Sequence, residues 1–328
     1  MNVLVTGGAG YIGSHLVRVL AEAGHHCVLF DNLCSGHAES VEGFPLVRGD
    51  LTSDSSALVE CMHAEKIEAV IHLAAFIEAG ESAVDPAKYF NNNTIGGLRL
   101  LEAMRRAGVG KMVFSSTAAV YGSPRRVPIQ ETDRLEPINP YGASKLCMEL
   151  MLRGFAAAHD MGFVALRYFN VAGASPDGRI GEAHRSETHL IPLVLQVAQG
   201  KRPHIGIFGE DYDTPDGTCI RDYIHVMDLA AAHVLALEAA TPGQFRAYNL
   251  GNGEGFSVKQ IIETCRQVTG HAIPAKATPR RPGDPDRLVA DSTLAQRELR
   301  WQPQYAAIET IVEHAWNWHK SHPNGYGV

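Results

Sequence analysis

Two side chains in the stretch 139–149, NPYGASKLCME, could carry out proton transfer together. Tyr141 and Lys145 are four residues apart at the start of an expected helix, so one turn places the phenol and the ammonium on the same face. A tyrosine with an ordinary pKa of about 10 is a poor base at neutral pH, but a neighbouring cation stabilises its phenolate. Thr117 ends an earlier strand-like run, and its hydroxyl can hydrogen-bond a reacting oxygen. The three side chains could therefore take a proton from an alcohol while hydride leaves the same carbon.

A glycine-rich turn near the N-terminus predicts a site for a nucleotide. The segment TGGAGYIGSH (6–15) follows a strand-like run and opens a helical pattern, with Gly7, Gly10 and Gly13 in the spacing G-x-x-G-x-x-G. Glycines there let the backbone approach a pyrophosphate, which binds free N–H groups at the helix start. A lone glycine motif is also typical of a plain tight turn. Its place in the first strand–helix unit favours the nucleotide site.

Acidic residues at two strand ends indicate which dinucleotide binds. Asp31 ends the second expected strand, where a carboxylate accepts hydrogen bonds from a ribose 2′-OH and repels a 2′-phosphate. The segment DNLCSG (31–36) contains no Arg or Lys to receive such a phosphate. The sequence therefore favours NAD over NADP. Asp50, after the third strand, is placed to reach the adenine, although a surface loop acid is nearly as good an interpretation.

The elements that must position these residues alternate along the first half of the chain. Short β-branched runs are separated by helical patterns near 53–65, 92–107 and from Tyr141 onward, which predicts right-handed crossovers and a parallel sheet covered on both faces. We therefore expect an α/β fold with a doubly wound parallel (Rossmann) sheet. The expected strands are 2–6, 26–30, 46–50, 69–74, 111–116 and 163–169.

The pattern loosens after about residue 170. Two long polar loops, 173–187 and 209–222, lie among further helical segments, and loops of this length often carry function. We expect an NAD-binding domain over 1–170, which includes the Tyr–Lys helix, and a smaller α/β lobe over 171–328, with the chain crossing between them. The later helical segments are 188–199, 225–239, 257–268 and 308–319.

Composition excludes several classes of protein. The chain of 328 residues is 45% hydrophobic and 20% charged, with a net charge of −7, which argues against a general affinity for nucleic acid or anionic membranes. It shows no secretory signal and no apolar run long enough for a bilayer, and its six cysteines are scattered, so we expect a cytoplasmic protein with reduced thiols. Sixteen histidines show no familiar metal-ligand spacing, so no metal site is expected.

Several motifs together resemble the extended short-chain dehydrogenases from one end of the chain to the other, and their nucleotide-sugar epimerase branch in particular. The motifs are the glycine turn, the Thr117–Tyr141–Lys145 set, RYFNVAGA (167–174), RDYIHVMDLA (221–230), YNLGNGEGFSV (248–258) and WNWHKSHPNGY (316–326).

The resemblance implies an NAD-dependent isomerase of galactose metabolism. It would interconvert UDP-galactose and UDP-glucose by transient oxidation at sugar C4, as a homodimer, with UDP-N-acetylhexosamines as further candidate substrates. Related dehydratases carry an Asp–Glu pair directly after the Ser/Thr, and related decarboxylases a glutamate, where this chain has Ala118 and Ala119. Other enzymes that modify UDP-sugars, uronate epimerases included, stay as alternatives. So does a non-catalytic NAD-binding protein, which would be expected to lack Tyr141 or Lys145.

The same resemblance assigns residues to each ligand. The chain departs from the family at two positions. Ile77 stands where many members have a lysine touching the cofactor, and His189 stands where asparagine is common. Leu288 aligns with the residue that walls the pocket beside sugar C2. The cofactor set is Gly7, Gly10, Tyr11, Ile12, Gly13, Asp31, Asn32, Ser35, Gly36, Asp50, Leu51, Leu73, Ala74, Ala75, Asn92, Ser115, Tyr141, Lys145, Tyr168 and Phe169. The substrate set is Thr117, Asn170, His189, Leu190, Phe208, Arg221, Tyr223, Arg281, Asp284 and Leu288.

Overall fold

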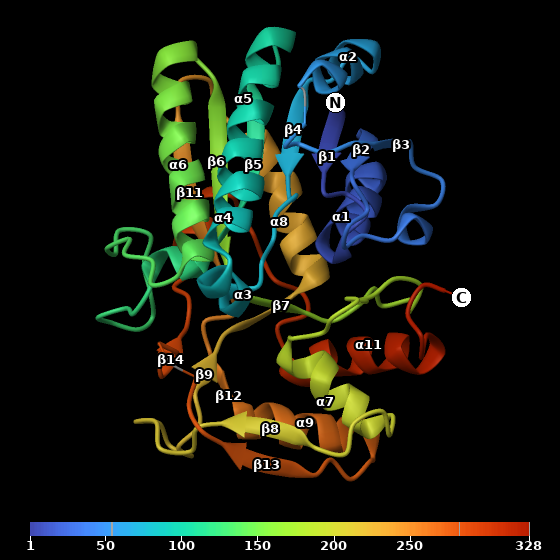
Figure 1. Cartoon of the computed structure of the whole chain (residues 1–328), viewed down its shortest axis with the longest axis vertical. Helices are drawn as coiled ribbons and strands as arrows, with labels where there is room; N and C mark the ends of the chain where they lie inside the picture. Colours follow the sequence, from blue (N-terminus) through green and yellow to red (C-terminus); the bar gives the residue numbers. More distant parts are fainter. Residues whose placement is uncertain (54, 282, 328) are drawn as a thin grey trace.

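A seven-stranded sheet forms the centre of the larger of two lobes. The computed structural model describes residues 1–53, 55–281 and 283–327. All neighbouring strands of the sheet are parallel, in the order β11-β6-β5-β4-β1-β2-β3, which confirms the doubly wound sheet (Figure 1). The strands are β1 (Asn2–Thr6), β2 (His26–Asp31), β3 (Leu46–Arg48), β4 (Ala69–His72), β5 (Lys111–Thr117), β6 (Gly162–Tyr168) and β11 (Phe245–Leu250).

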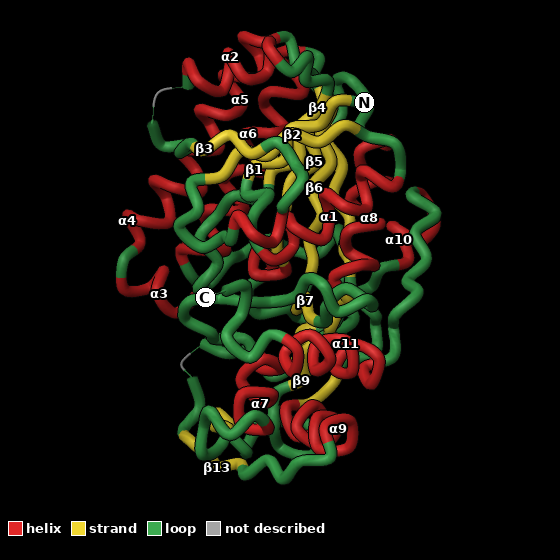
Figure 2. The backbone as a smooth tube through the Cα atoms, turned by 90° about the vertical axis from the view of Figure 1, so that its right-hand side faces the viewer, coloured by secondary structure: helices red, strands yellow, loops and turns green. Residues whose placement is uncertain are grey.

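Helices cover both faces of this sheet because its central strands are apolar on both sides. Leu4 of β1 packs in one core with α2 (Ser56–Ala64), α5 (Gly96–Ala107) and α6 (Pro140–His159). Val5, the next residue, packs in the other core with α1 (Tyr11–Glu22) and α8 (Val226–Ala239). Figure 2 shows α5 and α6 on one side of the strands and α1 and α8 on the other.

Segments from the second half of the chain thus return to the large sheet. Strand β11 pairs with β6, and α8 and α10 (Thr293–Glu298) contribute to the core under α1. The strand order reverses between β1 and β4, and ligands of such sheets bind beside the carboxyl ends of the strands at this point.

The small lobe has its own core between three helices and short strands (Figure 1). The three helices are α7 (Leu190–Ala198), α9 (Val258–Thr269) and α11 (Ile308–Ser321). The short strands are β7 (Asn170–Ala172), β8 (Ile205–Phe208), β9 (Ile220–Arg221), β10 (Tyr223–His225), β12 (Phe256–Ser257), β13 (Ala275–Thr278) and β14 (Arg287–Leu288).

Short helical pieces fill the connections of the large lobe. They are η1 (Ala38–Val41), α3 (Ala79–Val84), α4 (Pro86–Tyr89), the π-helical η2 (Phe90–Ile95) and η3 (Ala118–Tyr121). Among the helices of the described residues, none combines the length and hydrophobicity needed to cross a bilayer.

Candidate functional site

The glycine turn between β1 and α1 is too tight for any other residue at two positions. Gly7 has a φ of +74°, and a Cβ there would lie 2.6 Å from the backbone nitrogen of Ala74. A Cβ on Gly13 would lie 2.5 Å from the carbonyl oxygen of Gly7. Gly10 is the N-cap of α1 and caps it with no side chain, so the first N–H groups of this 12-residue helix face outward from the turn. This geometry fits a pyrophosphate.

Asp31 lies next to this turn, and Asp50 is hydrogen-bonded to Asn32, the residue after Asp31. The buried Asp31 accepts hydrogen bonds from the backbone nitrogens of Ala9 (3.0 Å) and Leu33 (2.8 Å), which fix its carboxylate beside the glycines. Asp50 accepts from Asn32 Nδ2 at 3.0 Å and from both the backbone and the hydroxyl of Thr52. The backbone bond from Thr52 contributes most to lowering the pKa of Asp50. These bonds fix the orientation of both carboxylates.

Leu73, Ala74 and Asn92, also predicted to bind the cofactor, make hydrogen bonds near the same sheet edge. Leu73 and Ala74 donate their N–H groups to the carbonyl of Thr6 at 2.9 and 3.0 Å, which joins β4 to the glycine turn. Asn92 donates to Asn93, whose amide binds both the N–H and the carbonyl of Phe76. Other predicted residues use their side chains for packing, among them Ile12, Leu51 and Phe169, which lie in or against hydrophobic clusters.

Tyr141, Lys145 and Thr117 come together at the carboxyl end of β5. Helix α6 begins at Pro140 because Asn139 accepts a hydrogen bond from Gly142 N (2.8 Å), and this start places Tyr141 in the first turn. The Tyr141 hydroxyl is hydrogen-bonded to Thr117. Lys145 is 3% exposed and donates from Nζ to the carbonyl of Ser115 at 2.8 Å. The predicted trio is therefore assembled by two adjacent elements, β5 and α6.

The electrostatics of the trio differ from the simple expectation that Lys145 lowers the pKa of Tyr141. Burial raises the pKa of Tyr141 to about 12, and the hydrogen bond with Thr117 offsets only part of this rise. Burial also lowers the pKa of Lys145 to about 7, which weakens the positive charge that this side chain can offer the phenol. The protein alone thus favours a neutral phenol, and a further positive charge beside the phenol is needed to form the phenolate.

Tyr168 and the residues after Thr117 complete the surroundings of the trio. Tyr168 is hydrogen-bonded to Ser115 through the two hydroxyls, and burial raises its pKa well above the ordinary value. Ala118 and Ala119 start η3, which packs tightly on α6, since a Cβ on Gly142 would lie 2.6 Å from the Ala119 carbonyl. The side chains directly after Thr117 therefore offer methyl groups and no proton donor.

Most of the predicted substrate residues lie in the small lobe. Arg221 forms an ion pair with Asp284, and the guanidinium of Arg281 lies 3.9 Å from the ring centroid of Phe208. A pocket of about 330 Å³ beside them is lined by Glu187, Thr188, Leu193, Arg202, His204, Ile205, Gly206, Phe208 and Arg281. His189 and Leu190 stand next to this pocket at the start of α7.

Three further predicted substrate residues lie on short strands of the small lobe, β7, β10 and β14. Asn170 in β7 donates its amide to the carbonyl of Asp222 at 3.2 Å. Leu288 pairs with Arg221 and packs against the small cluster around Tyr121. Tyr223 is 5% exposed inside the core of the small lobe, so in this structure its side chain packs among apolar residues.

One cluster of titratable residues was missed by the sequence reasoning. Glu182, His184, Glu187 and His189 converge, with one ligand atom from each within 4.8 Å of the others. Burial opposes the charge on His184, but the adjacent carboxylates of Glu182 and Glu187 outweigh it and raise the pKa of His184 to about 9. The same two acids raise the pKa of His189 far above its ordinary value against the effect of burial. The spacing E-x-H-x-x-E-x-H was the available signal.

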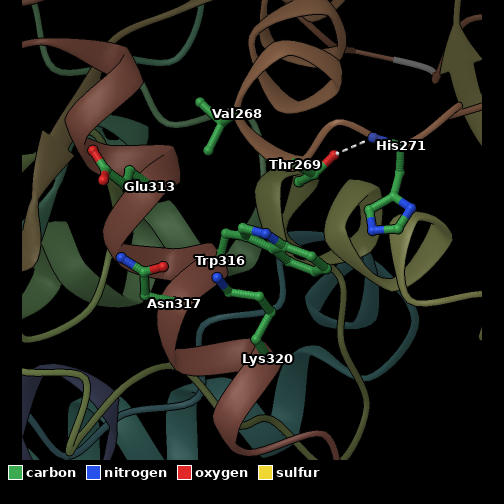
Figure 3. Close-up of a pocket in the computed structure, with 7 residues that line it drawn as sticks. All are labelled: Val268, Thr269, His271, Glu313, Trp316, Asn317 and Lys320. Atoms are coloured by element: carbon green, nitrogen blue, oxygen red, sulfur yellow. Dashed lines mark hydrogen bonds between the residues drawn. The ribbon is translucent and has the colours of Figure 1, made fainter.

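A second pocket lies away from these residues, between the end of α9 and α11. It measures about 520 Å³ and is lined by Val268, Thr269, His271, Glu313, Trp316, Asn317 and Lys320. Figure 3 shows the Trp316 indole between Lys320 and the Thr269–His271 turn. None of the predicted site residues lines this pocket, so the sheet edge remains the candidate site.

Comparison with known proteins shows similarity to NAD-dependent epimerases along the chain. The model of the NAD-dependent epimerase/dehydratase family matches residues 3–251. A UDP-glucose 4-epimerase of Halalkalibacterium halodurans is 55% identical over 329 residues, covering 100% of this chain and 98% of that protein. A crystal structure of a UDP-glucose 4-epimerase is 51% identical with a TM-score of 0.96 and full coverage of both chains. The Bifidobacterium longum enzyme in complex with NAD⁺ and UDP is 37% identical, with a TM-score of 0.94, over 99% of this chain and 100% of that one.

Proposed function

Because this chain belongs to the NAD-dependent epimerase/dehydratase family, we propose that it interconverts UDP-galactose and UDP-glucose by transient oxidation at sugar C4. The observation that carries the proposal is the hydroxyl pair of Tyr141 and Thr117 at the end of β5, followed by Ala118 and Ala119. This arrangement can move the proton of a sugar hydroxyl. It contains no acid beside Thr117 to expel water or assist decarboxylation, which separates it from the dehydratase and decarboxylase alternatives.

The residues at the sheet edge fit NAD. Gly7 and Gly13 leave the space that a pyrophosphate needs, and the fixed carboxylate of Asp31 suits a ribose diol. When bound, NAD supplies the hydride acceptor for C4 and the positive charge that the Tyr141 phenol lacks. The hydrogen bond from Lys145 Nζ to the Ser115 carbonyl joins α6 to β5 and so fixes the orientation of the helix that carries Tyr141.

Proton transfer falls to Tyr141 and Thr117. The Tyr141 oxygen takes the proton of the sugar 4′-OH, while the Thr117 hydroxyl holds the reacting oxygen and passes the proton along. If hydride then returned to the opposite face of C4, the same two hydroxyls would give the proton back to the reacting oxygen, net redox would be zero and the cofactor would have no need to leave. The sugar must turn over between the two steps, which requires that the UDP end alone is firmly held.

We assign that hold to the small lobe. Arg221 and Arg281 supply the cations that a pyrophosphate needs in a chain of net charge −7. Residues 1–170 would then form the NAD-binding domain and residues 171–328 the UDP-sugar lobe, with α8, β11 and α10 crossing back to the large sheet.

A homodimer is the proposed assembly. Several apolar side chains are exposed on η2, α5 and α6, which pack beside one another, and burying such a patch favours association. They are Phe90, Ile95, Leu98 and Leu150. Light scattering should give twice the chain mass for the wild type and a monomer for Leu98→Glu/Leu150→Glu. A monomeric wild type would exclude the dimer.

Two measurements test the proposed function. Protein purified without added cofactor is denatured and assayed for released NAD, and the native protein is tested on UDP-galactose. We expect close to one NAD per chain and formation of UDP-glucose. No turnover even with NAD added would refute the proposal, whereas turnover only with added NAD would refute tight retention alone.

The sugar range is proposed to extend to UDP-N-acetylglucosamine at a lower rate. Leu288 in β14 stands beside Arg221 and carries no hydroxyl, so it leaves more room near sugar C2 than a tyrosine would. A pocket change of this size shifts discrimination by about 1–3 kcal/mol. The ratio of kcat/KM for the two substrates should rise toward UDP-glucose in Leu288→Tyr, and an unchanged ratio would remove Leu288 as the gate.

A further inference from the structure

The segment between β7 and α7 holds four side chains whose ligand atoms point at one common point. Glu182 and Glu187 are almost fully buried, with side chains 4% and 6% exposed. His184 Nδ1 lies 3.2 Å from one oxygen of each acid, and His189 Nδ1 lies 2.9 Å from Glu182 and 3.1 Å from Glu187. Both imidazoles therefore turn the same nitrogen, Nδ1, toward both carboxylates.

Hydrogen bonds satisfy only part of this arrangement. Each imidazole nitrogen carries a single directed hydrogen or lone pair, but here each nitrogen faces two carboxylate oxygens. Glu187 accepts the hydrogen bonds from His184 and His189, at 3.2 and 3.1 Å. The Oε1 atom of Glu182 is buried and finds no hydrogen-bond partner of suitable geometry in the described part of the chain. A buried carboxylate oxygen in this condition is costly, and it points into the cluster.

A metal ion would satisfy all four groups at once. The ligand atoms lie within 4.8 Å of one another, and the ligands of a tetrahedral zinc site, with bonds of about 2.0–2.2 Å, lie about 3.4 Å apart. On binding, the imidazole–carboxylate pairs, now at 2.9–3.2 Å, would move apart slightly, and the pairs that are farther apart, up to 4.8 Å, would move together. Two carboxylates balance the charge of a divalent ion, and imidazole nitrogens favour zinc-like ions over magnesium or calcium.

We propose that Glu182, His184, Glu187 and His189 bind one divalent transition-metal ion of the zinc type. The site is structural and lies outside the catalytic trio. The metal fastens a loop that is hydrogen-bonded to the large lobe at two points: His37 is hydrogen-bonded to the carbonyl of Ala183 at 2.8 Å, and Thr188 donates to Glu78 at 2.8 Å. This departs from the expectation of no metal site, which rested on familiar ligand spacings.

Metal content of the purified protein tests the proposal without any use of activity. The protein is stripped with a chelator, loaded with Zn²⁺, separated from free metal and analysed by mass spectrometry of the element. Affinity is measured by competition with a coloured chelator. We expect one Zn²⁺ per chain, and Co²⁺ in its place should give the visible bands of tetrahedral coordination. A Mg²⁺ excess should not displace it.

Glu182→Gln removes one ligand while keeping the volume of the side chain. Loss of a group that only hydrogen-bonds to a metal ligand weakens binding by ~10–100-fold, so loss of a ligand itself should weaken Zn²⁺ binding by at least this factor. The circular dichroism spectrum should be unchanged, which shows that the variant is folded. His314→Asn is the matched control, because His225 Nε2 and His314 Nδ1 also lie close, at 3.0 Å. Wild-type affinity in Glu182→Gln, loss of binding in His314→Asn, or no Zn²⁺ retained by the wild type would overturn the site and leave a cluster of ion pairs. A wild-type Co²⁺ spectrum without tetrahedral bands would do so even where Glu182→Gln fails to fold.

Discussion

Arg167→Met should remove about 3–5 kcal/mol of the free energy of unfolding, because it leaves a buried carboxylate without its counter-ion. The side chains of Arg167 and Glu149 are 1% and 0% exposed. The guanidinium donates to both carboxylate oxygens, from Nε at 2.9 Å and from Nη2 at 2.6 Å. Without it, Glu149 keeps one hydrogen bond, from Ser116 Oγ at 2.6 Å. Since native proteins are stable by only about 5–15 kcal/mol, the loss is a large share of the total.

The double variant Glu149→Leu/Arg167→Met removes both charges and should be more stable than Arg167→Met alone. Apolar side chains of similar volume can replace a buried ion pair at little cost. The remaining penalty is the Ser116 hydroxyl, which loses its acceptor at about 1–3 kcal/mol, while Tyr121 still donates to Asn249 at 2.7 Å. The two substitutions are therefore expected to be strongly non-additive.

Urea unfolding followed by circular dichroism measures these differences, with all variants saturated with NAD and extrapolated to water. A loss below about 1 kcal/mol for Arg167→Met would contradict the treatment of this pair as a desolvated charge pair. So would a double variant that is less stable than Arg167→Met.

Three further predictions concern the site. Tyr141→Phe should lower kcat by about 10²–10⁴-fold with UDP affinity in calorimetry unchanged, and a near-normal kcat would show that another group is the base. Gly13→Ala should release NAD because its Cβ would lie 2.5 Å from a carbonyl oxygen. The control Gly154→Ala, with no atom within 4 Å of the added carbon, should keep NAD and gain up to about 1 kcal/mol in free energy of unfolding. Equal NAD contents in the two purified variants would contradict this. Lys145→Met should stabilise the NAD-free protein most at and below pH 7, because folding lowers the pKa of Lys145 from 10.5 to about 7 and the unfolded chain binds more protons between these values. The gain should shrink as pH rises, and a gain independent of pH in urea unfolding would contradict the assignment.

The strands up to β6 could be predicted because a local sequence pattern marks each of them. Runs such as KMVFSST are buried along almost their whole length, and glycine or polar residues separate them from helices. Strand β11 was not predicted, since FRAYNL carries the exposed Arg246 and becomes a strand by pairing with β6 from far earlier in the chain. The helix expected over 92–107 begins instead as the π-helical η2, where Asn93 is drawn into bonds with Phe76 and Ser144.

In the site, too, locally determined features could be predicted and features that depend on the whole fold could not. Residue types and spacing were enough to select Tyr141, Lys145 and Thr117, since the helix start and the strand end are local features. The pKa values were not predictable, because they follow from burial, which depends on the whole fold. The convergence of Glu182 with His189 depends on how a long loop lies against both lobes, and no local periodicity encodes such a path.

The position of β11 at the edge of the large sheet also affects how the protein is made. During synthesis, β6 leaves the ribosome well before β11, which lies beyond four short strands and two helices. At ~5–20 residues per second, the backbone groups of β6 on that side stay unpaired for several seconds. An open apolar strand edge is a template for pairing with other chains. The nascent chain therefore passes through an interval in which β6 needs protection, by a chaperone or by partial docking of α6, before residue 250 completes the sheet.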